Sequence, residues 1–256
     1  MKQRASDFAL LVLIGLAVVP IGLLVISSMA SGWLWPHVLP PAWSGRAWIY
    51  LTDPSSEIGA ALRSSFAIAT AVGFVSSILA LPAARAFASY SFRFRGLAMG
   101  LLALPALVPP LASTMGLHRM LLWQDLTDTA FGVGLAHIVP ALPYAVLVLT
   151  NSFRRIDPQL EWQARTLGAN VFEVWRSVLI PLIAPGIAAA FALAFLISWN
   201  QYLLTLLIGG GHVLTLPLEV VAFQRSGDEA TSAALAVLFL LPPVLVFGFA
   251  SKYLRG

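Results

Sequence analysis

Long uninterrupted apolar runs are the feature that most constrains how this chain can fold. A helix needs about 20 such residues to cross the ~30 Å hydrocarbon core of a bilayer. Only helices and closed barrels satisfy their backbone in lipid, and these runs lack the period-two alternation of strands. We therefore predict an all-α polytopic membrane protein with six transmembrane helices, at Phe8–Met29, Leu62–Phe87, Leu97–His118, Phe131–Asn151, Leu182–Ile208 and Ser232–Tyr253.

Sparse charge agrees with a chain that lies in lipid. Only 10% of its 256 residues are charged and 59% are hydrophobic, whereas about a quarter of a soluble domain is charged. There is no cysteine, which excludes disulfides and thiol chemistry. The four histidines are scattered and no H-E-x-x-H pattern occurs, so we expect no metal site. No basic stripe is dense enough to follow phosphates, so we expect no nucleic-acid partner.

The placement of Lys and Arg predicts the orientation of the spans. With the N-terminus in the cytoplasm, 11 of the 15 Lys and Arg residues fall on the inner side and 4 on the outer side. Cytoplasmic loops carry such an excess, and an even number of spans leaves both termini in the cytoplasm. Arg85, Arg93 and Arg95 belong to the inner group, and we interpret them as topology anchors.

Two features of the spans leave alternatives. Phe8–Met29 follows a basic start, as in a signal peptide, but its apolar run exceeds the roughly 7–15 residues of a signal, so we expect it to be retained. Prolines interrupt the third, fourth and sixth spans. They either reflect the ordinary composition of membrane helices or kink helices that line a cavity or act as hinges. These prolines are Pro105, Pro109, Pro110, Pro140, Pro143, Pro242 and Pro243.

A charged loop of about residues 155–181 separates the fourth and fifth spans. Asp157-Pro158 predicts a helix start, because Asp is a favoured N-cap and Pro a favoured first residue. Glu161 and Arg165 form an i, i+4 pair on this helix. Gly168 predicts its end. Asn170, with a Glu three residues on, predicts a capping box for a second helix, which Pro181 and Pro185 are expected to end.

The pattern therefore predicts helix, sharp turn, helix on the cytoplasmic side. Each helix has about ten residues, which is marginal alone in water, so each needs a surface to pack on. One interpretation is an amphipathic helix on the lipid headgroups. The other is a docking element for a soluble partner, with a helix lying in a groove. Periodicity alone does not separate them.

This loop resembles the signature loop of binding-protein-dependent ABC transporter permeases. That pattern is Glu-Ala-Ala, three residues, Gly, nine residues, then Ile-x-Leu-Pro. Ala164, Gly168 and Pro181 match it outright, and Val178 and Ile180 match in kind. Trp162 and Gln163 depart from the Glu and first Ala, although a Glu stands one position earlier. The resemblance assigns ATPase coupling to Glu161, Trp162, Gln163, Ala164, Arg165, Gly168, Ala169, Val178, Ile180 and Pro181.

The resemblance extends over most of the chain. Ala61–Ser65 is similar to the entry of the permease core, which divides the chain into 1–60, the first span and first outer loop, and 61–256, the core. Trp35-Pro36, Trp48–Tyr50 and Thr215–Pro217 look like the spermidine/putrescine branch.

The resemblance implies a permease subunit of an ATP-driven importer in the bacterial inner membrane. Its partners would be a pair of ATPase subunits, a second permease, usually a paralogue, an extracytoplasmic solute-binding protein and membrane lipid. The chain has no G-x-x-x-x-G-K-[ST] loop. We therefore expect no enzymatic activity and no cofactor of its own, with ATP and Mg²⁺ bound by the partner ATPase. The implied solute is small and organic, such as a polyamine or a thiamine-like cation.

Polar residues within the fifth span are candidates for the solute pathway. They form one cluster, whose alternative role is hydrogen bonding between helices and an interfacial aromatic belt: Ser198, Trp199, Asn200, Gln201 and Tyr202. His118 and His137 lie near outer span ends, where we interpret them as interfacial, with contact to the solute as the alternative. Glu219, Asp228 and Glu229 make the outer loop acidic, either as a solvated face or to attract cations or the binding protein.

A self-sufficient secondary transporter or channel is the alternative function. Against it, no inverted repeat is visible and no acidic residue lies deep in a span. An intramembrane enzyme is disfavoured because no catalytic constellation is visible. A requirement for a separate ATPase separates the importer from both.

Overall fold

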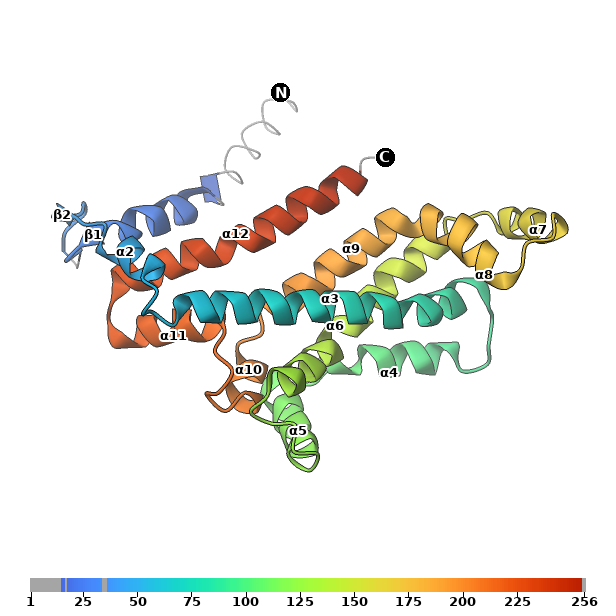
Figure 1. The fold of residues 1–256 in the computed structure, drawn as a ribbon, viewed down its shortest axis with the longest axis horizontal. Coiled ribbons are helices and arrows are strands. Elements are labelled where there is room, and N and C mark those ends of the chain that lie inside the picture. The colour runs from blue at the N-terminus through green and yellow to red at the C-terminus, as the bar shows by residue number, and fades with distance from the viewer. Residues whose placement is uncertain (1–14, 17, 34–35, 255–256) are drawn as a thin grey trace, which may run out of the picture. The chain divides into compact units, whose positions relative to one another are not determined.

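The computed structural model describes residues 15–16, 18–33 and 36–254, and almost all of its regular structure is helical (Figure 1). Its contacts divide the chain into two compact units. Unit 1 comprises residues up to Leu62 together with Thr215–Pro243, and unit 2 comprises Arg63–Leu214 together with the residues from Val244 onward. The predicted division into 1–60 and 61–256 stays a prediction.

Unit 1 contains a short apolar helix, Val18–Ser28, followed by a two-residue β-ladder. Strand β1 (Ala30–Ser31) pairs antiparallel with β2 (Ala42–Trp43), and α2 (Arg46–Thr52) follows. The C-terminal contribution is α11 (Leu216–Ser226) and the first part of α12 (Glu229–Leu254).

Two contacts join α2 to the α11–α12 region of unit 1. Arg46 forms an ion pair with Asp228 at 2.8 Å, and the rings of Tyr50 and Phe223 meet edge to face at 5.6 Å.

Unit 2 is a bundle of helices. They are most of α3 (Ile58–Ser89), α4 (Arg95–Leu107), α5 (Pro110–Leu122), α6 (Ala130–Phe153), α7 (Pro158–Thr166), α8 (Val171–Val174), the π-helical turn η1 (Trp175–Leu179), α9 (Ile180–Trp199) and α10 (Leu203–Ile208). Figure 1 shows α7 and α8 beyond the ends of α6 and α9, near the C-terminal end of α3.

The pair α6 and α9 forms the centre of unit 2. Their packing uses small residues, since Ala145 and Ala190 are fully buried and Gly186 lies so close to Ser152 that any side chain there would collide with it. Small residues let helix backbones approach closely in a membrane, where van der Waals contact replaces the hydrophobic effect as the driving force. This pair therefore provides a rigid base for the loop that joins the two helices.

Four described helices are long and apolar enough to cross a membrane: Ile58–Ser89, Ala130–Phe153, Val171–Trp199 and Glu229–Val246. They correspond to the second, fourth, fifth and sixth predicted spans. The predicted first span lies partly outside the described residues, and its described part is the Val18–Ser28 helix.

The third predicted span, Leu97–His118, is not one kinked helix. It consists of α4 and α5, which meet at 92° around Pro109. If this bent pair is counted as one span, the number of described helices that could cross a membrane rises from four to five. Pro109 and Pro110 both lack an N–H, and Pro110 is the first residue of α5. Two adjacent prolines therefore end one helix and begin another, a sharper interruption than the predicted kink.

The fifth predicted span, Leu182–Ile208, is displaced toward the N-terminus. The long helix begins at Val171 and ends at Trp199, and the remaining residues form the separate short helix α10. Pro185 lies inside α9 and does not end it. The prediction overestimated how strongly a proline near a helix start interrupts the hydrogen-bond ladder.

Candidate functional site

The loop between α6 and α9 forms the predicted helix–turn–helix. The Asp157 side chain accepts a hydrogen bond from the Gln159 N–H at 2.9 Å, and Pro158 is the first residue of α7. Gly168 has φ of +91°, in the region that only glycine adopts easily. The predicted N-cap, first-turn proline and glycine stop are confirmed.

The second helix begins with the predicted capping box. Asn170 accepts from the Glu173 N–H at 3.0 Å, and the Glu173 carboxylate accepts from the Asn170 N–H at 2.8 Å. Both bonds satisfy amides that a helix start would otherwise leave unpaired.

The prediction that Pro181 ends this helix is wrong. The chain passes from α8 through η1 into α9 without leaving a helical conformation. In η1 the Ile180 N–H bonds to the carbonyl of Trp175, five residues earlier. We attribute the wider turn to Pro181, because its ring crowds the preceding turn and it has no N–H to donate. The second loop helix is therefore the start of a membrane span.

The loop carries large apolar side chains that the described part of this chain leaves exposed. Trp162 is 71% exposed, Leu167 89%, Val171 60% and Phe172 70%. We call these four the apolar loop patch. Moreover, α7 buries none of its residues. On this helix Leu160 is also exposed, whereas Ala164 is half-buried. A short helix with large apolar side chains left exposed by the described part of its own chain is unusual.

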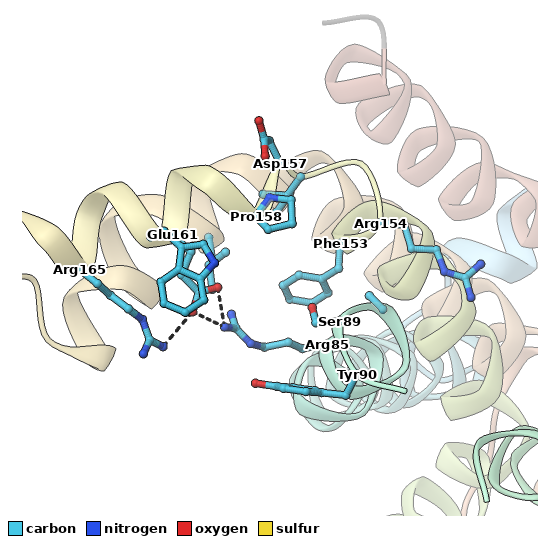
Figure 2. Close-up of a pocket in the computed structure, with 13 residues that line it drawn as sticks. Arg85, Ser89, Tyr90, Phe153, Arg154, Asp157, Pro158, Glu161 and Arg165 are labelled. Atoms are coloured by element: carbon cyan, nitrogen blue, oxygen red, sulfur yellow. Dashed lines mark hydrogen bonds and ion pairs between the residues drawn. The ribbon is translucent and has the colours of Figure 1, made fainter. Parts of the chain in front are cut away.

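Glu161 lies at the centre of an ion-pair cluster on the inner face of α7 (Figure 2). Both of its oxygens accept from Arg85 of α3, at 2.7 and 2.8 Å, and one accepts from Arg165 at 2.9 Å. The Arg85 guanidinium also lies 4.9 Å from the centre of the Trp175 ring in η1. The interpretation of Arg85 as a topology anchor is incomplete, since its side chain joins three elements.

A cavity of about 570 Å³ adjoins this cluster. Its walls come from the C-terminal end of α3, the end of α6 and α7, and include Arg85, Tyr90, Phe153, Arg154 and Glu161. Figure 2 shows Arg154 directed away from Glu161, in contrast to Arg85 and Arg165.

The remaining predicted loop residues lie on different faces. Gln163, Gly168 and Ile180 are exposed, whereas Ala164, Ala169 and Val178 are half-buried. Pro181 is exposed at the start of α9. Sequence reasoning missed Phe172 of the apolar loop patch, and it missed the contacts of Arg85 and Trp175. A large apolar residue in an otherwise polar loop was a usable signal for Phe172 only.

The predicted pathway cluster in the fifth span does not form a single site. Ser198 and Trp199 are buried, and Trp199 stacks on Phe195 at 5.7 Å between ring centres. Asn200 is exposed and donates from its side chain to the Leu196 carbonyl at 2.8 Å. Ser198 and Trp199 thus contribute to packing inside the bundle, whereas the Asn200 side chain bonds back onto its own helix.

Gln201 lies in the break between α9 and α10, beside a cavity of about 160 Å³. This cavity is also lined by Ser113, Thr114 and Pro140. Among the described residues the Gln201 side chain has no hydrogen-bond partner, while Tyr202 is half-buried next to it. Gln201 is therefore the member of the cluster whose side chain borders a cavity.

The interpretation of His137 as an interfacial residue is wrong. Its ring is 2% exposed, with Nδ1 2.9 Å from the Ser198 hydroxyl and Nε2 3.1 Å from the Thr205 hydroxyl. The ring thus joins α6 to both sides of the α9–α10 break. His118 is half-buried and its Nδ1 has no partner in the described part of the chain.

The acidic residues of unit 1 have different environments. Burial raises the pKa of Glu219, and the nearby charge of Glu57 raises it further. Burial alone would raise the pKa of Asp228, but hydrogen bonds from Thr231 and the charge of Arg46 prevail and lower it. Asp228 is therefore not a fully solvated acidic residue, as one interpretation of the sequence expected, because Arg46 covers its carboxylate.

Comparison with known proteins agrees with this fold. A solved bacterial ABC transporter involved in import of the acidic polysaccharide alginate has a chain with TM-score 0.69 over 99% of this chain and 98% of its own, at 21% identity. ModB, the molybdenum transport system permease protein of Mycobacterium tuberculosis, is 32% identical over 78% of this chain and 81% of its own length.

A second relative is much longer than this chain. YnjC, an inner membrane ABC transporter permease protein of Escherichia coli, is 33% identical over 56% of this chain, but the match spans only 28% of YnjC. The model of the family described as binding-protein-dependent transport system inner membrane component matches residues 65–255. This match covers well over half of the sequence, so the chain belongs to the family of inner membrane components of binding-protein-dependent transport systems.

Proposed function

We propose that this chain is the permease subunit of an ATP-driven importer and that its loop from Glu161 to Pro181 docks on the partner ATPase. Membership of the permease family supports the general function. The single observation that carries the docking assignment is the apolar loop patch, together with the absence of any buried residue in α7. A short helix with its apolar residues uncovered needs a partner surface.

The route from the loop to the membrane supports the same assignment. Because α8, η1 and α9 form one helix from Val171 to Trp199, the segment that carries Val171 and Phe172 continues into a span. A displacement of this segment therefore moves α9 directly. In this proposal ATP and Mg²⁺ are bound by the ATPase, and the permease converts movement of the loop into rearrangement of its spans.

The solute and the other partners belong to the proposal as well. We propose a solute-binding protein outside the membrane and a second permease, a paralogue of this chain, which together complete the pathway. Gln201 and its adjacent cavity are the pathway residues that the geometry favours. The polyamine- or thiamine-like cation rests on the resemblance alone, since the relatives reported above carry names that refer to molybdenum and alginate.

Purification of the tagged chain from its native membrane in mild detergent tests the docking surface. We expect an ATPase subunit to co-purify with the wild type. The double variant Trp162→Asp/Phe172→Asp should retain less than about a tenth of it, because exposed aromatic anchors carry much of the energy of an interface. Trp123→Asp is the matched control, since Trp123 is 75% exposed but lies at the end of α5, outside the loop.

The outcome also separates the alternative function. A wild-type chain that purifies alone, and moves solute in liposomes without ATP, would contradict the importer and favour a secondary transporter. Full ATPase retention by the double variant would contradict the docking surface alone.

A further inference from the structure

We propose that Arg85 is a positioning residue that fastens the coupling helix α7 to the membrane-spanning helix α3, so that the two move as one body when the ATPase changes state. This inference rests on the proposed function and names how the loop acts on a second span besides α9. The observation behind it is the contact of one guanidinium with a carboxylate of α7 and an aromatic ring of η1.

Arg85 and Glu161 form a close, partly buried ion pair. One nitrogen of Arg85 donates to both oxygens of Glu161, at 2.7 and 2.8 Å. The side chains are only 14% and 23% exposed. Charge-assisted bonds in a partly buried setting are short, strong and directional, whereas exposed pairs contribute little.

Trp175 restricts the guanidinium on another side. The centre of its ring lies 4.9 Å from the Arg85 guanidinium carbon, within the range of a cation–π contact. Trp175 in turn packs edge to face against Phe153 at the end of α6, with 6.0 Å between ring centres. The Arg85 side chain is thus held between α7 and η1, and the end of α6 is held through the tryptophan.

Among the described residues, Arg85 makes the only ion pair that joins α7 to another element. No residue of α7 is buried, and among the described residues Glu161 makes the only ion pairs of this helix, one to Arg85 and one within α7 to Arg165. The i, i+4 pair with Arg165 stiffens the helix but does not join it to another element. Loss of Arg85 should therefore free α7 from α3 without unfolding the bundle.

Distance measurements between spin labels test this link, and the absence of cysteine makes label placement simple. One label replaces exposed Gln159 of α7 and the other exposed Ile78 of α3. The permease is measured in its native complex, without nucleotide and with ATP and vanadate. In the wild type we expect one narrow distance that is the same in both states. In Arg85→Gln we expect a broad distribution that shifts when nucleotide binds.

Two further variants distinguish positioning from a general structural defect. Glu161→Gln should reproduce the effect, and the double variant should be no worse than either single variant, because residues that act as one pair do not add. Arg154→Gln removes the same charge from the same cavity without breaking an ion pair, and should behave as the wild type. The rate of transport-coupled ATP hydrolysis should fall about tenfold in Arg85→Gln. A tenfold change corresponds to ~1.4 kcal/mol.

The result that overturns the link is a narrow, unchanged label distance in Arg85→Gln in both states. That outcome leaves the proposed function standing if the ATPase still co-purifies. Failure of the ATPase to co-purify with the wild type would instead remove the proposed function.

Discussion

At the scale of single residues, Gly168 shows a position whose identity the backbone dictates. Its φ of +91° lies where a side chain strains the chain, although no atom would touch an added Cβ. The requirement is therefore conformational and does not arise from crowding. The sequence pattern predicted this turn because glycine is the common residue for it.

Gly168→Val should reduce the amount of co-purified ATPase about tenfold, because a β-branched residue at positive φ costs roughly 1–3 kcal/mol and the turn would open to relieve it. Gly211 provides the matched control. Its φ is +82° with equally open surroundings, but it lies in the loop after α10. Gly211→Val should cost similar stability in a melting experiment and leave ATPase retention unchanged. Equal retention by both variants would contradict the role of the Gly168 turn.

Arg85, in contrast, has a contact that the sequence did not predict. Its position near the end of an apolar run indicated only a charge on the inner side of the membrane. Its partner Glu161 is 76 residues away in the sequence, so no local pattern connects the two. The Glu161–Arg165 pair could be predicted, since helical spacing brings i and i+4 together. A contact between distant segments depends on how α3 and α7 pack, and no local pattern records that.

At the scale of elements, the two proline pairs had different outcomes. Pro109-Pro110 separates α4 from α5 with a 92° bend, whereas Pro181 and Pro185 lie within one continuous helix. A π-helical turn immediately before Pro181 accommodates its ring, and the helix continues through Pro185. The sequence contains the prolines in both cases, but the surrounding turns decide their effect.

The contact between α2 and the start of α12 predicts a pH dependence in unit 1. Asp228 accepts from the Thr231 N–H and hydroxyl and from Arg46, and its pKa is lowered. Since the pKa is lower in the folded state, the stabilisation is complete above the ordinary Asp value of about 3.9. It is lost as the pH falls through the lower folded value.

Hydrogen exchange of the α2 amides in a lipid nanodisc between pH 6 and pH 2 measures this effect. The free energy of local opening should stay constant down to about pH 4 and then fall, with a few-fold increase in opening, as expected for a partly exposed pair of about 1 kcal/mol. Asp228→Asn should show the weaker protection at every pH. A pH dependence that persists in this variant would assign the effect to another group.

At the scale of the whole molecule, the distribution of Lys and Arg predicts which end of the bundle faces the cytoplasm. The positive-inside preference predicts that α7 lies inside and α11 outside. The chain without cysteine allows a direct test with a membrane-impermeant maleimide. Gln224→Cys on α11 should react in intact spheroplasts, and Gln159→Cys on α7 only after permeabilisation. Both positions are exposed, so the reverse pattern would invert the predicted orientation.

The sequence by itself determined the helical membrane class, most of the spans, the caps of α7 and α8 and the turn at Gly168. Each of these depends on neighbours within about ten residues or on the composition of one run. The tertiary structure alone decided that η1 joins the loop to α9, that His137 is buried between α6, α9 and α10, and that Arg85 joins α3 to α7. These features need contacts between segments far apart in the chain, which only the packed bundle brings together.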